Sequence, residues 1–146
     1  MPPAESTETR ALLFRVAGRV YGCALDLVRE IIPMRPATRL PGAPPWVHGL
    51  INLRGTILTV LDLGARLAPA HDLTRDGSII VVEVGGRMAG LAVGDVMDVA
   101  PIAAQSASTP GADDLVLGMG HLGDTVVILL DVPALIGQVL VSLGGG

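Results

Sequence analysis

The chain has 146 residues, a length that suits one domain or two very small ones. Half of its residues are hydrophobic and 16% are charged, which excludes a globally disordered chain. The net charge of −4 comes without a basic stripe and with only three aromatic residues, which argues against a nucleic-acid-binding barrel. No apolar run is long enough to span a membrane, and residues 1–10 do not form a signal peptide, so a cytoplasmic location is expected.

The first half predicts short strands and a short helix. Residues 1–10 are expected to form a disordered polar tail, and a hairpin follows, with strands at 11–16 and 20–25 around the Ala17-Gly18 turn. Residues 26–32 are ambiguous, because their apolar spacing also suits one or two helical turns before Pro33. The remaining predicted elements are an edge strand at 38–40, a rigid proline loop at 41–45, strands at 46–53 and 56–61 around Arg54-Gly55, and a helix at 62–67.

The second half returns to strands after a polar connection at 68–77. Predicted strands lie at 78–84, 87–93, 96–102, 115–117 and 125–130, with an exposed loop at 103–114. A helix is predicted at 133–143, because Pro133 suits its first turn and the apolar residues that follow recur at helical spacing. Many short strands and one docking helix indicate small β-barrels rather than a parallel α/β sheet.

The chain also repeats itself. Residues 12–24 align with 80–92 at an offset of 68, and residues 49–65 align with 118–134 at an offset of 69. A repeat this long predicts two similar subdomains in tandem, residues 11–67 and 68–146, which a strand shared across the boundary could link. Each would be a marginal core alone, so the two are expected to pack together. Function is expected where the copies differ, chiefly at residues 49–55.

No catalytic constellation is evident. Asp62 and Asp131 occupy the same place in the two copies and could suggest acid–base chemistry, but each precedes a helix start, which favours helix N-capping. Cys23 lies in an apolar strand and predicts a buried thiol rather than a nucleophile. No metal site and no cofactor are expected, because no metal-ligand spacing joins the three histidines, His48, His71 and His121.

Arg54 is the most unusual charged residue, because it interrupts a run of apolar and small residues. A guanidinium in that setting needs a fixed acceptor or a partner surface, and Glu30 is the carboxylate in a matching apolar context of the first copy. We therefore predict that Glu30 and Arg54 pair. The pair would either orient a turn or also shape a surface that binds a partner. Four apolar residues would form an exposed patch beside it or belong to the core: Leu25, Val28, Ile31 and Ile57.

The motifs at residues 21–31, 46–55 and 60–63 closely resemble the CheW family of chemotaxis coupling proteins, and residues 90–93, 118–124 and 127–131 follow the same pattern. The most specific segment is Gly49-Leu50-Ile51-Asn52-Leu53-Arg54-Gly55. The resemblance covers about residues 11–140 and implies two tandem SH3-like five-stranded β-barrels with short helices, including one at the C-terminus.

The resemblance also implies a non-enzymatic adaptor between the cytoplasmic tip of chemoreceptors and the regulatory domain of a CheA-type histidine kinase, recruited to membrane-associated receptor arrays. Glu30 and Arg54 would be the family's paired charges near the receptor surface, and the residues around that groove would be Leu25, Val28, Ile31, Gly49, Asn52 and Ile57. Two alternatives stay open: a role in twitching or gliding motility, and a regulator that competes for the kinase.

Overall fold

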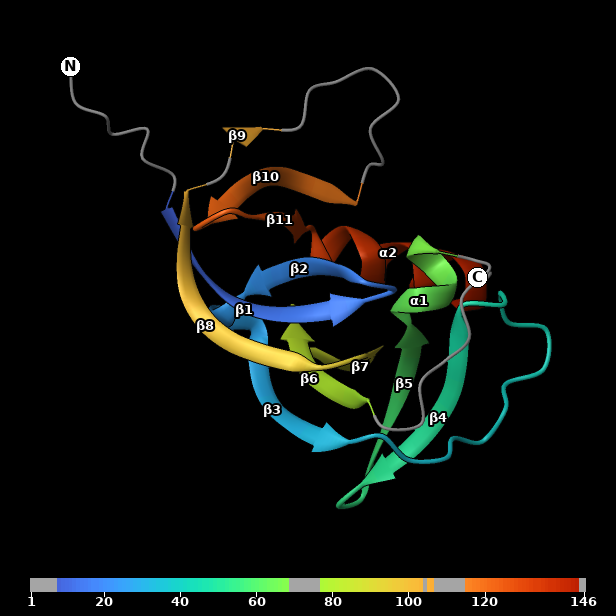
Figure 1. Cartoon of the computed structure of the whole chain (residues 1–146). Coiled ribbons are helices and arrows are strands. Elements are labelled where there is room, and N and C mark those ends of the chain that lie inside the picture. Colours follow the sequence, from blue (N-terminus) through green and yellow to red (C-terminus); the bar gives the residue numbers. More distant parts are fainter. Residues whose placement is uncertain (1–7, 69–76, 104, 107–114, 145–146) are drawn as a thin grey trace.

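The computed structural model describes residues 8–68, 77–103, 105–106 and 115–144, and it confirms the predicted mainly β class with two barrel-like sheets (Figure 1). The elements in chain order are β1 (Glu8–Val16), β2 (Arg19–Ala24), the 3-10 helix η2 (Leu25–Leu27), β3 (Val28–Pro33), β4 (Val47–Leu53), β5 (Thr56–Asp62), α1 (Leu63–Leu67), β6 (Ser78–Val84), β7 (Arg87–Val93), β8 (Val96–Ala103), β9 (Gln105–Ser106), β10 (Val116–Leu122), β11 (Thr125–Leu130) and α2 (Val132–Gly144). No helix in the described part of the chain is long and apolar enough to cross a membrane.

Each sheet takes strands from both copies of the repeat. One has the order β8-β1-β2-β11-β10-β9, and the other has the order β3-β6-β7-β5-β4. The β1–β2 hairpin of the first copy therefore lies between strands of the second copy, and the β6–β7 hairpin lies between strands of the first. The two copies have exchanged equivalent hairpins. The predicted boundary near residue 67 separates the repeats, but it does not separate the sheets.

The strand registers follow the same repeat. In one sheet β2 runs parallel to β11 with Gly22 opposite Leu129, and in the other β7 runs parallel to β5 with Gly90 opposite Val60. A Cβ atom added at Gly22 would lie 3.0 Å from the Leu129 side chain, and one at Gly90 would lie 3.2 Å from the Val60 side chain. These equivalent glycines let the strands of the two copies meet closely at both crossings.

The core consists of one shared cluster and one small cluster in each sheet. Side chains alternate along a strand, so β1 directs Leu12 and Phe14 into the shared cluster and Leu13 into the cluster of its own sheet. Its counterpart β6 does the same, with Ile80 and Val82 in the shared cluster and Ile79 and Val81 in the other small cluster. Both central hairpins are thus buried on two faces, which joins the two sheets into one hydrophobic unit.

The structure corrects several element boundaries. β1 begins at Glu8 rather than residue 11, because residues 8–10 pair with the distant strand β8; residues 1–7 of the predicted tail lie outside the described residues. The ambiguous residues 26–32 form the end of η2 and then β3, since pairing with β6 outweighs their helical spacing. The predicted edge strand at 38–40 is reduced to a bridge between Thr38 and Leu50. β10 is longer than predicted, while residues 69–76 and most of the loop at 103–114 lie outside the described part.

Candidate interaction site

The β4–β5 turn has a backbone that suits glycine at two successive positions. Arg54 has a φ of 49° and Gly55 a φ of 90°, as expected for the tight turn of a two-residue hairpin. The Asn52 side-chain oxygen accepts a hydrogen bond from the Gly55 N–H at 2.8 Å, which closes the turn. Asn52 therefore shapes the turn from its exposed position in β4.

The second copy of the repeat shows which residue type the turn conformation favours at the position of Arg54. At the offset of 69 the equivalent residue is Gly123, with a φ of 62°. The other non-glycine residue with positive φ among those described is Ala17, with a φ of 51°, and its equivalent in the second copy is Gly85. A side chain in this conformation costs about 1 kcal/mol. An arginine at position 54 is therefore not explained by the needs of the turn.

The predicted contact between Arg54 and Glu30 is confirmed: the guanidinium donates to the Glu30 carboxylate and forms an ion pair. The side chains are 68% and 33% exposed, respectively. An ion pair this exposed contributes about 1 kcal/mol or less. It holds the turn against β3 but does not make Arg54 a major source of stability.

Arg35 makes a second contact between the same segments, and it was not predicted from the sequence. Its guanidinium donates to the backbone carbonyl of Asn52. The available signal was the one that identified Arg54, a lone cation between apolar Met34 and Pro36. Two arginines thus fix the β4–β5 turn beside the strand that carries Glu30.

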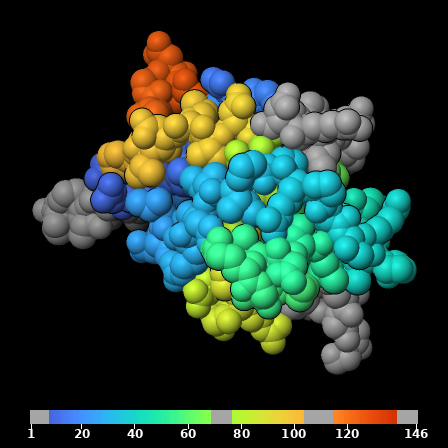
Figure 2. Space-filling model, turned by 90° about the horizontal axis from the view of Figure 1, so that it is seen from below, coloured from blue at the N-terminus to red at the C-terminus, as the bar shows by residue number. Residues whose placement is uncertain are grey.

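The four apolar residues predicted near this pair fall into two groups. Leu25 and Val28 are partly buried and pack against the shared core. Ile31 and Ile57 are exposed to 44% and 59%, respectively. Figure 2 shows β3 and the segment after it, in cyan, on the same face as the green β4–β5 hairpin. We call the surface around the ion pair the Arg54 face; it comprises Glu30, Asn52, Arg54 and Ile57, whereas Ile31 follows Glu30 in β3 and points to the other side of that strand.

Gly49 lies near the start of β4, away from the Arg54 turn, and lets the segment after β3 approach that strand closely. It is buried with a φ of 145°, and a Cβ atom there would collide with the backbone carbonyl of Thr38. The absence of a side chain lets Thr38 and Leu50 exchange backbone hydrogen bonds of 2.8 Å, which anchor the chain between β3 and β4.

We expect Gly49→Ala to lower the free energy of unfolding by about 2–4 kcal/mol, because backbone must move as well as adopt a strained φ. Gly42→Ala is the matched control. Gly42 has a φ of 80° and no atom within 4 Å of an added Cβ, so only about 1 kcal/mol should be lost. Urea denaturation measures both; equal losses would show that the contact with Thr38 is unimportant.

The residues considered for chemistry have structural roles. Asp62 and Asp131 are confirmed as helix caps, accepting hydrogen bonds from the N–H groups of Ala65 at 3.1 Å and Ala134 at 3.0 Å, respectively. Cys23 is fully buried, and burial raises the pKa of its thiol to about 12, so the unreactive protonated form prevails. The described residues contain no group of three or more potential metal ligands, and His71 lies outside them.

The six-stranded sheet carries an apolar surface that was not predicted. The β10–β11 hairpin exposes four large apolar side chains by 43–54%: Leu117, Met119, Leu122 and Val126. Val126 is the counterpart of Ile57 at the offset of 69. We call this surface the β10–β11 face. A possible sequence signal was the run of alternating large and glycine residues at 117–120.

Comparisons with known proteins agree with this architecture. A family model for the CheW-like domain matches residues 10–140. A chemotaxis protein CheW from Rhizobium meliloti is 42% identical over 89 residues, which make up 60% of this chain and 57% of that protein. One from Klebsiella aerogenes is 27% identical over 139 residues, covering 90% of this chain and 84% of that protein. The crystal structure of scaffolding protein TtCheW from Thermoanaerobacter tengcongensis matches with a TM-score of 0.76 at 30% identity, covering 86% of this chain and 90% of that one.

Proposed function

This chain belongs to the CheW-like domain family, and on that basis we propose that it is a non-enzymatic adaptor of chemosensory signalling. It would couple the cytoplasmic tip of chemoreceptors to a CheA-type histidine kinase within membrane-associated receptor arrays. The observation that carries the proposal is Arg54, which occupies a glycine-type backbone position and extends an exposed cation beside exposed Ile57. Interaction surfaces commonly combine arginine with apolar side chains in this way.

Two separate surfaces would serve two partners. The Arg54 face offers a cation beside the exposed Ile57 and would bind the receptor. The β10–β11 face offers four exposed apolar side chains and would bind the regulatory domain of the kinase. Large exposed apolar side chains gathered on one surface mark an interaction site. An adaptor needs such separate surfaces in order to hold both partners at once.

Charge reversal distinguishes a structural ion pair from a binding surface. Arg54→Glu should weaken binding of a receptor hairpin fragment about tenfold or more, since a charge-assisted contact is replaced by repulsion. Combining it with Glu30→Arg restores an opposite-charge pair in reversed order. The double variant should unfold at the wild-type temperature yet still bind the fragment poorly. If the pair only orients the turn, the double variant will bind like wild type.

The complete proposal is tested by a pull-down with the receptor fragment and the kinase regulatory domain, separately and then together. An adaptor retains both partners in one complex. If the partners exclude each other, the chain is a competitor that regulates the kinase, and coupling is disproved. Leu122→Glu on the β10–β11 face should reduce capture of the kinase domain alone, whereas Arg54→Glu should reduce capture of the receptor fragment alone.

A further inference from the structure

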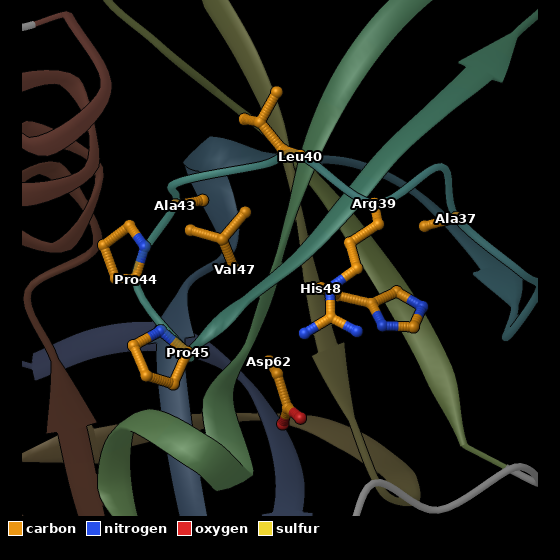
Figure 3. Close-up of a pocket in the computed structure, with 9 residues that line it drawn as sticks. All are labelled: Ala37, Arg39, Leu40, Ala43, Pro44, Pro45, Val47, His48 and Asp62. Carbon is orange, nitrogen blue, oxygen red and sulfur yellow. The ribbon is translucent and has the colours of Figure 1, made fainter.

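A cavity of about 390 Å³ lies between the proline-rich segment after β3 and the ends of β4 and β5, on the first copy of the repeat (Figure 3). Six of the nine residues that line it are apolar, and the three polar ones, Arg39, His48 and Asp62, contribute much of its surface (Figure 3). A cavity of this size that combines apolar residues with a few polar groups has the character of a site for a small polar molecule. Neither the adaptor role nor the Arg54 face accounts for it.

The cavity is preformed by local backbone structure. Pro44 and Pro45 restrict the chain, and two hydrogen bonds fold it, from the Ala43 N–H to the Leu40 carbonyl at 3.2 Å and from the Val47 N–H to the Pro44 carbonyl at 3.0 Å. The backbone around the cavity is therefore fixed before a ligand arrives, so that only side chains need to move on binding, which lowers the entropy lost.

His48, which lines this cavity, carries a buried polar atom without a hydrogen-bond partner. Its Nε2 is buried and has no hydrogen bond, a state that costs about 1–3 kcal/mol. The equivalent residue in the second copy, at the offset of 69, is Leu117, so the fold accepts an apolar residue at this position. A histidine there gains its missing partner if a ligand enters beside it. Because Nε2 is closed to solvent, entry requires a rotation of nearby side chains, of which Arg39 is exposed and able to move.

The charges around the cavity select the ligand. Arg39 has no hydrogen-bond or ion-pair partner among the described residues, and its side chain lines the same cavity as His48 and Asp62 (Figure 3). Asp62 uses one carboxylate oxygen to cap α1, and its negative charge disfavours a multiply charged anion. We propose that the cavity binds a monocarboxylate with a short aliphatic stem, whose oxygens accept from Arg39 and His48 and whose stem contacts Leu40, Val47 and the prolines.

Hexanoate is a suitable probe, with the neutral hexanamide as its control. We expect saturable shifts of the backbone amide signals of His48 and Gly49 in NMR titrations with hexanoate, and binding of hexanamide that is about tenfold weaker. Arg39→Gln should weaken hexanoate binding by a similar factor. His48→Leu should also weaken it, and should raise the thermal stability of the free protein by removing the unpaired atom. If His48→Leu does not fold, the affinity of Arg39→Gln for hexanoate alone tests whether the polar side chains of the cavity bind the carboxylate.

Asp62→Asn gives the most discriminating result, because asparagine also caps a helix but carries no charge. We expect hexanoate to bind this variant several-fold more tightly. Weaker binding, or the absence of saturable shifts in the wild-type protein, would overturn the inference and leave the adaptor role intact. The carboxylate could be a free acid or an acidic side chain of a partner. If Arg39→Gln loses binding of the receptor or the kinase, the natural ligand is an acidic side chain of that partner. If partner binding is unchanged, the natural ligand is a free acid.

Discussion

The first repeat alone, as a fragment of residues 1–72, is expected to remain unfolded as a monomer, although it contains every strand of one predicted barrel. In the native chain its β1–β2 hairpin pairs with β8 and β11, and its β3 and β5 pair with the β6–β7 hairpin. The fragment therefore exposes both edges of β1–β2 and the inner edges of β3 and β5. A small monomer that exposes unpaired strand edges, and apolar side chains that are buried in the intact protein, cannot form a stable fold.

Circular dichroism and size-exclusion chromatography measure this result. Mixing the fragment with residues 73–146 should restore a folded complex, because each fragment supplies the hairpin that the other lacks. A folded dimer of the first fragment would also agree, since a second copy can donate the equivalent hairpin. A folded monomer with a cooperative transition would show that the hairpin exchange is unnecessary. The intact chain should unfold in a single transition, because one core cluster joins the two sheets.

The second large effect concerns Arg54 and its matched control, Ala17. Arg54→Gly and Ala17→Gly each place at a positive-φ turn position the residue that the other repeat carries there. The relief of backbone strain, about 1 kcal/mol, is partly offset by the greater freedom of glycine in the unfolded chain. We expect neither variant to lose stability in urea denaturation, and Arg54→Gly alone to lose receptor binding.

Loss of more than about 2 kcal/mol in Arg54→Gly would mean that the ion pair with Glu30 is a major stabilising contact, contrary to its exposure. The presence of an arginine at position 54 would then be explained by its contribution to the stability of the fold. If Arg54→Gly is stable but binds the receptor fragment poorly, then Arg54 slightly destabilises the fold and is needed for receptor binding.

Local sequence patterns were sufficient for the strands but not for their arrangement. Alternating apolar residues and glycine turns predicted both central hairpins, and the repeat predicted two similar units. The hairpin exchange could not be predicted, because a hairpin paired within its own repeat and one paired with the other repeat have the same local sequence. Glycines such as Gly22 and Gly90, which allow strands of the two copies to meet closely, can be interpreted in this way only when their neighbours are known.

The site was predicted in part for a similar reason. An arginine among apolar residues indicated the pair with Glu30 without knowledge of the fold. The exposure of Ile31 depends on where β3 begins. As a helical turn, residues 26–32 would put Val28, Ile31 and Ile32 on one face, whereas a strand starting at Val28 exposes Ile31 and turns Ile32 inward. Long-range pairing with β6 decides between these patterns, and no local signal reports it.

Calorimetric titration of a receptor hairpin fragment into the wild-type protein, Arg54→Gly and Ala17→Gly tests most directly that Arg54 serves recognition. The wild-type protein and Ala17→Gly should bind with the same affinity, and Arg54→Gly should bind about tenfold more weakly or not measurably. Equal affinities for all three folded proteins would contradict the account.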